Sequence, residues 1–372
     1  METSVFILLL ILTADLYLNR RTRWAALTSA LLLLTRPDGV LFVGPLILDL
    51  VVRRARERKF PWAEAGIFLL ALAPWAIFAT AYFGTPIPHS IAAKTLAYRL
   101  PPEAALVRLI QHYGTPFFEH LVFGTGFWPL AGFVLYLALG AIGGLAIVRR
   151  EPRAWPVALY PWLYFVAFAL ANPLIFRWYL APPLPFYFLL ILSGMAKLAT
   201  DLWKEKEKGS TLALGFFFPI FFFLSLSAWT LRPDHGPARP APAMAWHKLE
   251  LLYEQVGREL VSRAAPETVI AAGDVGALGY YSGARILDTV GLMSPEASPY
   301  YPLDATLYVI NYAVPPQLIL DRKPEYVVLL EVYGRKGLFV DSQFLSGYQL
   351  VQKIPTDIYG SDGMLIWQRP EK

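Results

Sequence analysis

The chain has 372 residues, of which 56% are hydrophobic and only 16% are charged. Soluble globular proteins carry about 25% charged residues, so this composition favours an apolar environment. The chain contains no cysteine, which excludes a disulfide, a thiolate metal site and a cysteine nucleophile. Its basic residues lie in short clusters between apolar runs, a pattern that indicates membrane topology and argues against nucleic acid as a partner.

Charge is distributed unevenly along the chain. Residues 1–231 carry 20 Lys and Arg against 12 Asp and Glu, a net charge of +8. Residues 232–372 carry 13 against 16, a net charge of −3. The first part is also the apolar one, so we expect a membrane-embedded first part and a water-soluble second part.

Five segments have the roughly 20 apolar residues that a transmembrane helix needs. They are residues 61–83, 126–148, 155–175, 179–199 and 210–231. The run at 179–199 contains Pro182, Pro183 and Pro185 near its start, which predicts irregular first turns in that span.

The first 52 residues contain three shorter apolar runs, at 5–18, 24–34 and 40–52. We interpret them as a short span followed by a tight hairpin that turns at residues 35–39. A secretory signal peptide is the alternative for the first run, but it lacks a basic beginning and a small-residue cleavage site.

Basic clusters set the expected orientation. They lie at residues 20–23, 53–59, 149–153 and 204–208. Alternating passes bring every cluster to one side, as the positive-inside rule expects for the cytoplasm. The sequence therefore predicts eight passes with both termini outside, in a bacterial cytoplasmic membrane. The turn at 35–39, a loop at 84–125 and the C-terminal domain would then be extracytoplasmic.

The C-terminal part is expected to be a small α/β domain. A Pro-rich linker at 232–243 precedes an amphipathic helix near 244–264, where Leu249, Leu252, Val256 and Leu260 recur at helical spacing. Strand-like runs follow at 268–272, 326–332, 348–354 and 364–368. The predicted organisation is thus a helical membrane domain at 1–231, the linker, and an α/β domain at 244–372.

Arg36 and Asp38 form the first candidate site, in the turn between two half-length helices. Ionisable side chains at the edge of a membrane are costly unless they are paired or face a polar cavity, so they indicate function. The alternative is structural: Asp38 caps the next helix and the Arg36 side chain extends towards water.

His89 and Lys94 form the second candidate site, directly after the span at 61–83. Lys94 offers a fixed positive charge and His89 a hydrogen-bond donor, which suits a phosphate group. The alternative is an interfacial helix whose lysine meets lipid head groups. His112 and His120 follow in the same loop, and we expect them to be solvated.

Further candidates are Arg177, Asp274 and Asp288. Arg177 precedes the Pro-rich span and either binds an anionic lipid head group or extends towards water. Asp274 lies in a Gly-rich stretch without Walker or Rossmann spacing, which favours a strand-to-helix turn capped by Asp274. Asp288 either binds a sugar hydroxyl or fixes a turn.

Several of these motifs, in their order along the chain, resemble bacterial GT-C class glycosyltransferases, especially relatives of arabinofuranosyl- and mannosyltransferases. The motifs are Met1-Glu2-Thr3, Thr35-Arg36-Pro37-Asp38-Gly39, Pro88-His89-Ser90 with Lys94, Arg177-Trp178-Tyr179-Leu180, and the stretches at 274–282 and 288–292. The likeness covers most of the chain, and it rests on the order and topology of motifs that are individually weak.

The resemblance implies a GT-C-like fold and a membrane enzyme. Such an enzyme moves a sugar from a polyprenyl-phosphate donor to a lipid, glycan or protein acceptor at the outer membrane face. Many members use a divalent cation, Mg²⁺ or Mn²⁺, and an acidic residue as base. Arg36, Lys94, His89 and Arg177 would bind the donor phosphate, with Asp38 and Tyr179 in support.

The resemblance also implies that the chain starts late. Members of the class normally begin with another helix and a large outer loop that carries the catalytic acid, and Glu2 is the only matching acid here. Two other functions stay open on the residues alone: a transporter or flippase for lipid-linked sugars, and a membrane-anchored domain that binds a glycan or a partner without chemistry.

Overall fold

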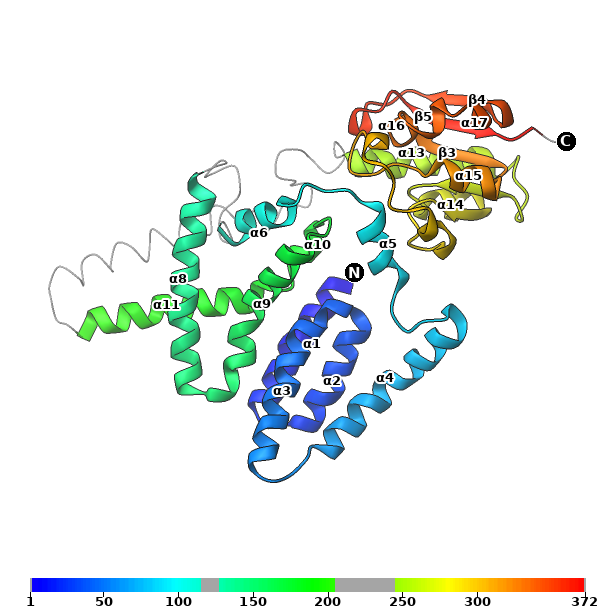
Figure 1. Ribbon diagram of the computed structural model, residues 1–372. Coiled ribbons are helices and arrows are strands. Elements are labelled where there is room, and N and C mark those ends of the chain that lie inside the picture. Colours follow the sequence, from blue (N-terminus) through cyan, green and yellow to red (C-terminus); the bar gives the residue numbers. More distant parts are fainter. Residues whose placement is uncertain (1, 115–126, 205–244, 371–372) are drawn as a thin grey trace. The chain divides into compact units, whose positions relative to one another are not determined.

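The computed structural model describes residues 2–114, 127–204 and 245–370, and these residues belong to two compact units. The helical unit combines the described parts of Met1–Pro86 and Pro102–Thr230, and the α/β unit combines those of Ile87–Pro101 and Leu231–Lys372. Figure 1 shows helices in the first unit and a mixed sheet with helices in the second.

The helical unit begins with three short helices, α1 (Glu2–Leu18), α2 (Thr22–Thr35) and α3 (Val40–Arg56). They have 17, 14 and 17 residues, each below the roughly 20 that a perpendicular crossing needs. The predicted tight turn between α2 and α3 is present as one 3-10 turn, η1 (Pro37–Gly39). Gly39 is suited to this turn, because an added Cβ would lie 3.2 Å from the Phe6 ring.

Four described helices are long and apolar enough to cross a membrane. They are α4 (Trp62–Phe83), most of α8 (Phe127–Arg150), α9 (Trp155–Ala171) with the preceding turn η2 (Pro152–Ala154), and most of α11 (Leu184–Lys204). These helices confirm the predicted spans at 61–83, 126–148, 155–175 and 179–199. The predicted span at 210–231 lies outside the described residues, so the count of eight passes stays a prediction.

Two helices end or begin where the sequence disfavours helix. α9 stops at Ala171 because Asn172 adopts a left-handed conformation with φ 43°, 4 residues before the end of the predicted span at 175. The short helix α10 (Arg177–Leu180) follows, and α11 begins only at Leu184, beyond Pro182 and Pro183. This break confirms the irregular start that the prolines predict.

Glycines let α8 and α11 pack with their backbones in close contact, and Figure 1 shows the two helices crossing. A Cβ built on Gly143 would lie 1.9 Å from the Leu190 carbonyl oxygen, and one on Gly194 would lie 2.0 Å from that of Leu139. Close approach at small residues is the usual way in which helices associate in lipid. The helix α6 (Ala104–Gly114) also packs against α8.

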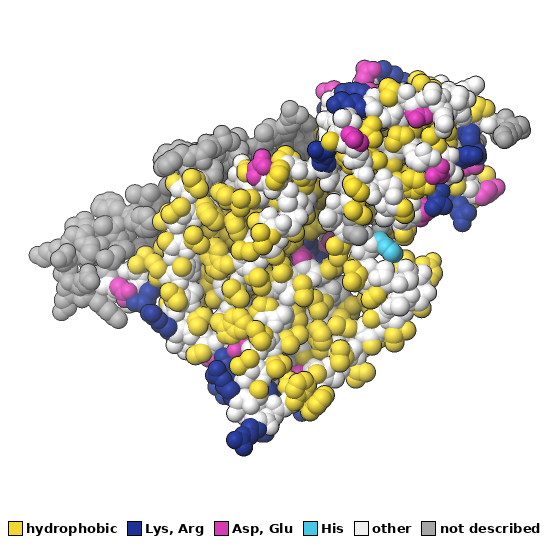
Figure 2. Space-filling view, viewed as in Figure 1, with side chains coloured by type: hydrophobic (Ala, Val, Ile, Leu, Met, Phe, Trp, Pro, Cys, Tyr) yellow, Lys and Arg dark blue, Asp and Glu magenta, His cyan; other side chains and the backbone are white. Residues whose placement is uncertain are grey.

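Charged side chains gather at one end of the helical unit. Figure 2 shows an apolar belt with Lys and Arg at its lower end, near the turns that join α3 to α4 and α8 to α9. Arg53, Arg54 and Arg56 lie in the last turn of α3, and Arg149 and Arg150 in that of α8. The opposite end of the α2–α3 hairpin carries Arg36 and Asp38.

The α/β unit contains a five-stranded sheet in the order β2-β1-β3-β5-β4. Its strands are β1 (Val269–Ala272), β2 (Arg285–Asp288), β3 (Tyr326–Leu330), β4 (Gln349–Ile354) and β5 (Met364–Gln368). β1 pairs in parallel with β2 and β3, whereas β5 pairs in antiparallel fashion with β3 and β4. Four of the strands confirm the strand-like runs; β2 was not predicted.

Helices complete the α/β unit. They are α13 (Ala245–Leu260), α14 (Gly276–Ser282), α15 (Pro316–Arg322), α16 (Glu331–Gly334) and α17 (Ser342–Gly347), with the 3-10 turns η4 (Pro295–Tyr300), η5 (Ala305–Leu307), η6 (Leu338–Val340) and η7 (Ile358–Gly360). α13 packs against α14 and buries Leu249, Tyr253, Val256 and Leu260, which largely confirms its predicted apolar face. Every residue of β3 is buried, as expected for a central strand covered on both faces.

The α/β unit also includes a segment from far earlier in the chain, the helix α5 (His89–Ala97). α5 packs against η4, and Ala97 is fully buried in the core of this unit. The next residues continue the contact: the Arg99 amide donates to the Asn311 carbonyl at 2.9 Å, and Tyr98 lies against Tyr312. In the sequence this segment lies within the predicted outer loop at residues 84–125.

Candidate functional site

Arg36 and Asp38 form a buried ion pair in the helical unit. The Arg36 Nε and Nη2 atoms donate to the two Asp38 carboxylate oxygens at 3.0 and 2.9 Å. Arg36 is only 4% exposed, and its guanidinium also lies over the rings of Phe6 and Tyr179. Asp38 therefore pairs with Arg36, and no side chain caps α3, so the predicted structural alternative of a capping Asp38 and a solvated Arg36 is wrong.

The ion pair connects three distant parts of the chain. Arg36 Nη1 donates to the Trp178 carbonyl at 3.3 Å and lies 3.5 Å from the Thr3 hydroxyl. The Tyr164 hydroxyl lies 3.2 Å from Asp38 Oδ2 and 2.7 Å from the Tyr179 carbonyl. We call Arg36, Asp38, Tyr164 and Tyr179 the Arg36 cluster. It brings together the motifs at 1–3, 35–39 and 177–180.

The remaining residues predicted for the membrane part are placed as follows. Glu2 is exposed at the start of α1 and directly precedes Thr3, whose hydroxyl lies 3.5 Å from Arg36 Nη1. Arg177 begins α10, but its side chain lies outside the described residues. His112 contradicts the prediction that it is solvated, because its Nε2 lies 2.9 Å from the Leu180 carbonyl and the ring is half-buried. His120 lies outside the described residues.

His89 and Lys94 both belong to α5 and hence to the α/β unit. His89 is its first residue, Lys94 lies in its last turn, and both side chains are half-buried. They thus belong to a different unit from the Arg36 cluster, and their predicted contact with the donor phosphate stays a prediction.

The second candidate site lies where the chain direction changes in the α/β sheet. From β1 the chain passes through α14 to β2 on one side, and it returns through α15 to β3 on the other side of β1. Ligands of open α/β sheets bind at such a switch point, outside the carboxyl ends of the parallel strands. Asp274 follows β1 at this edge, and Tyr333 follows β3.

Asp274 is surrounded by acidic and phenolic side chains. The Tyr333 hydroxyl donates to Asp274 Oδ2 at 3.4 Å, which is a long hydrogen bond. Burial and the neighbouring Glu250 carboxylate raise the pKa of Asp274 to about 6. The charge of Asp274 in turn raises the pKa of Tyr253 and of Tyr359, although burial is the larger cause for both. We call these five residues the Asp274 cluster.

The Tyr253 hydroxyl is buried and makes no well-formed hydrogen bond with a described residue, although the Asp274 backbone amide lies close enough to lower its pKa. Tyr253 is 0% exposed and extends from α13, and Asp274 and Glu250 are among the groups whose charges act on it. A buried hydroxyl without a well-formed hydrogen bond costs free energy, so its place beside two carboxylates points to a ligand or water that completes the hydrogen bonds.

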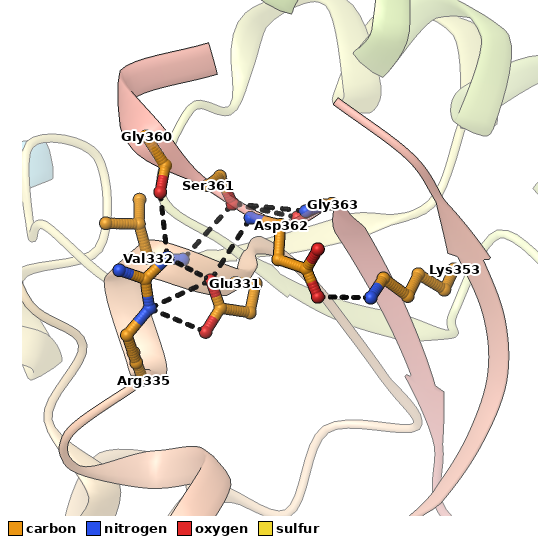
Figure 3. Close-up of polar contacts among 8 residues, drawn as sticks. All are labelled: Glu331, Val332, Arg335, Lys353, Gly360, Ser361, Asp362 and Gly363. Carbon is orange, nitrogen blue, oxygen red and sulfur yellow. Dashed lines mark hydrogen bonds and ion pairs between the residues drawn. The ribbon is translucent and has the colours of Figure 1, made fainter. Parts of the chain in front are cut away.

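The loop that directly follows Tyr359 is held by a network of polar contacts at residues 360–363 (Figure 3). Tyr359 has a left-handed φ of 54°, which is unfavourable for a bulky residue. Arg335 pairs with Glu331 and donates to the neighbouring Gly360 carbonyl at 2.8 Å, while the Ser361 hydroxyl accepts from the Val332 amide at 3.2 Å. Lys353 pairs with Asp362 in the same loop. These contacts fix a loop whose Tyr359 side chain is 44% exposed.

The two predicted residues of the α/β domain differ in role. Asp274 does not cap α14: the cap residue is Val275 and no side chain bonds the helix start, so that prediction is wrong. The strand-to-helix turn itself is present. Asp288 fixes a turn, because its oxygens accept from the Val290 and Met293 amides at 2.9 and 2.8 Å and the residue is 1% exposed.

The described residues contain no preformed cluster of three metal ligands. Nowhere among them do three or more His, Asp or Glu side chains come close enough to form a metal site. Both oxygens of Asp38 already face Arg36. A role for Mg²⁺ or Mn²⁺ therefore has no support from the described part of the chain, and no chemical step is assigned to one.

Comparison with known proteins identifies the C-terminal region alone. Residues 243–367 match a family model described as a domain of unknown function (DUF8728). The matched range covers α13, the strands β1 to β4 and all of β5 except Gln368. The chain matches no curated protein and no solved structure.

Proposed function

We propose that this protein handles a polyprenyl-phosphate-linked sugar at the extracytoplasmic face of a membrane and transfers the sugar to a lipid, glycan or protein acceptor. The observation that carries the proposal is the Arg36 cluster, in which three sequence-distant motifs meet at the end of the hairpin opposite the basic residues. The resemblance of these motifs to GT-C class enzymes supports the choice of chemistry.

Within this proposal Arg36 is a positioning residue. Its donors face Asp38, the Trp178 carbonyl and Thr3, so little of its hydrogen-bonding capacity is left for a phosphate. Through its hydrogen bond to the Trp178 carbonyl, Arg36 holds α10, whose first residue is Arg177. We assign to Arg177 the stabilisation of negative charge on the departing phosphate, a role for which guanidinium geometry is well suited.

Glu2 is the carboxylate that the proposal assigns as general base. It is exposed and directly precedes Thr3, whose hydroxyl lies near Arg36 Nη1. The acceptor hydroxyl would attack the anomeric carbon while the bond from that carbon to the phosphate oxygen breaks. The hydroxyl proton passes to the Glu2 carboxylate, and the polyprenyl phosphate leaves with the bonding electron pair.

The test is sugar transfer by the full-length protein in proteoliposomes that contain a labelled polyprenyl-phosphate sugar and a membrane extract as acceptor. Glu2→Gln should lower the transfer rate by about 10²-fold or more with donor binding retained, because general base catalysis is worth that much. Arg177→Gln should weaken donor binding as well. Arg56→Gln, at the basic end of α3, is the matched control and should leave both unchanged.

Two results would reject the transferase. Movement of the labelled lipid between leaflets without transfer would identify a flippase. Glycan binding without transfer would identify a binding protein, a second function that the Asp274 cluster specifically favours, because two carboxylates and an exposed tyrosine suit hydroxyl-rich ligands.

A further inference from the structure

A pocket of about 620 Å³ lies at the basic end of the helical unit. Its wall is formed by the turn between α1 and α2, the last turn of α3 and the start of α4. The charged residues that line it are Arg20, Arg21, Arg23, Arg54, Lys59 and Glu64. The pocket lies at one end of α2 and α3, and the Arg36 cluster lies at the other end.

The pocket carries an excess of positive charge. Its single carboxylate, Glu64, is buried and already accepts hydrogen bonds from the Thr22 hydroxyl at 2.6 Å and from Arg54 at 3.2 Å. Arg20, Arg21, Arg23 and Lys59 are exposed, and no described residue forms an ion pair or side-chain hydrogen bond with them. Four cations therefore surround the opening with their charges uncompensated.

Backbone features also make this pocket favourable for an anion. Both α2 and α4 begin at the wall of the pocket, and the residue that precedes each helix provides no side-chain cap. Uncapped amide groups and the helix dipole make such helix starts favourable positions for anions. Arg20 also has a left-handed φ of 61°, a conformation that glycine or asparagine adopts more easily. An arginine therefore stands where local backbone preference favours a smaller residue.

Exposed aromatic side chains indicate that the pocket opens at the interface between the membrane and water. Trp24, Phe60 and Trp62 line the pocket and are 62%, 50% and 75% exposed. Tryptophan concentrates at the interface between the hydrocarbon and the head groups of a membrane. The helix α4 that rises from Trp62 has only 6% of its apolar window buried within the protein, so lipid chains are its natural neighbours.

We propose that this pocket binds the phosphate head group of an anionic phospholipid from the leaflet at the basic end of the bundle. The four free cations and the two helix starts bind the phosphate, and the exposed rings and the outer face of α4 contact the acyl chains. This site is distinct from the proposed sugar transfer, because it lies at the opposite end of the hairpin and involves none of the residues assigned to that reaction.

Lipid retention tests the proposal directly. The full-length protein, purified in detergent, is mixed with phosphatidylglycerol or phosphatidylcholine, and bound lipid is counted by native mass spectrometry. We expect the wild type to retain phosphatidylglycerol preferentially. Arg21→Gln/Arg23→Gln should weaken this binding by about 30-fold, given the usual contribution of each basic residue to binding at an anionic membrane surface. Arg56→Gln/Arg58→Gln removes the same charge from the same end outside the pocket and should bind as the wild type does.

Two further measurements distinguish a loss of lipid binding from a loss of folding. Arg21→Lys/Arg23→Lys keeps the charges and should restore most of the affinity, and the thermal unfolding temperature without added lipid shows whether each variant is folded. Equal lipid loss in both glutamine pairs would overturn the proposal, since it would mean non-specific attraction. Displacement of the lipid by millimolar pyrophosphate would also overturn it, in favour of a soluble phosphate ligand. Neither result depends on sugar transfer.

Discussion

Arg36 and Asp38 form a buried ion pair, and its contribution to the free energy of unfolding depends on both side chains being present. Breaking such a pair by removing one partner leaves an uncompensated charge and typically costs about 3–5 kcal/mol. We therefore expect Arg36→Met to lower the free energy of unfolding strongly, as should Asp38→Leu. The double variant should be less destabilised than the sum of the two, with a coupling free energy of about 1–3 kcal/mol.

Unfolding of the detergent-solubilised protein in increasing denaturant measures the free energy of unfolding of the wild type, the two single variants and the double variant. Arg56→Met serves as the control for loss of an arginine, because Arg56 is exposed at the end of α3. Strictly additive free energies would show that the two side chains do not depend on each other, and that α10 is held in place by other contacts.

Asp274 predicts a dependence of stability on pH. Its pKa is raised from 3.8 to about 6, first by burial and then by the charge of Glu250. A raised pKa means that the folded protein binds the proton more tightly than the unfolded chain does. The stabilisation is therefore complete below about pH 4 and is lost as the pH rises through about 6.

Asp274→Asn removes the titrating carboxyl group, so comparison with the wild type should show how much of the pH dependence of stability comes from Asp274. At about pH 4 the variant and the wild type should unfold at similar temperatures, because both carry a neutral side chain. At about pH 7.5 the variant should be more stable by about 3 kcal/mol, since one unit of pKa shift corresponds to about 1.4 kcal/mol. Thermal unfolding at both pH values measures the difference, and a gap that does not grow with pH would contradict the assignment.

At the scale of elements, the contact between α8 and α11 depends on two glycines. A Cβ on Gly143 or Gly194 would overlap a backbone carbonyl of the facing helix, at 1.9 or 2.0 Å. Backbone cannot move aside as a side-chain tip can. Gly143→Ala should therefore force the helices apart and cost about 1–3 kcal/mol, as overpacking generally does.

The neighbouring Gly144 provides a matched control for this prediction. A Cβ there would meet the Ala158 Cβ at 3.6 Å, which is an ordinary van der Waals contact. Gly144→Ala should thus be neutral or stabilising by up to about 1 kcal/mol, because alanine favours helix. Unfolding measurements on the two single variants decide the point; equal effects would mean that α8 and α11 do not pack through Gly143.

At the scale of the whole molecule, features that depend on neighbours in sequence were predictable. The long apolar runs became α4, α8, α9 and α11, and the prolines at 182 and 183 became the break before α11. The same holds for β1, β3, β4 and β5, which read as apolar runs. Length and composition decide such elements because hydrogen bonding within lipid or within a buried sheet leaves few alternatives.

Features that depend on distant partners were not predictable. β2 has only four residues and begins with an exposed arginine, so no periodicity marks it; its pairing with β1 makes it a strand. α5 carries a weakly apolar pattern that does not reveal its packing against η4. The members of the Asp274 cluster come from α13, from the turn after β1, from α16 and from η7, and only Asp274 itself was a candidate.

The two proposed sites predict a definite topology, which the lack of cysteine in the chain makes easy to test. The basic clusters of the described residues, at 20–23, 53–59 and 149–153, lie at one end of the hairpins or spans, so translocation should retain that end in the cytoplasm and carry the α/β unit outward. Tyr280 is 82% exposed on α14, and Arg56 is exposed at the end of α3. In intact cells stripped of their outer layers, a membrane-impermeant maleimide should label Tyr280→Cys at once and Arg56→Cys only after permeabilisation.

The reverse order would exchange the compartments of both sites, leaving the pocket at Arg20 to Glu64 on the outside and the Arg36 cluster facing the cytoplasm. Sugar transfer at the outer face would then be impossible for this protein, because the carboxylate and the cation assigned to it would meet only cytoplasmic acceptors.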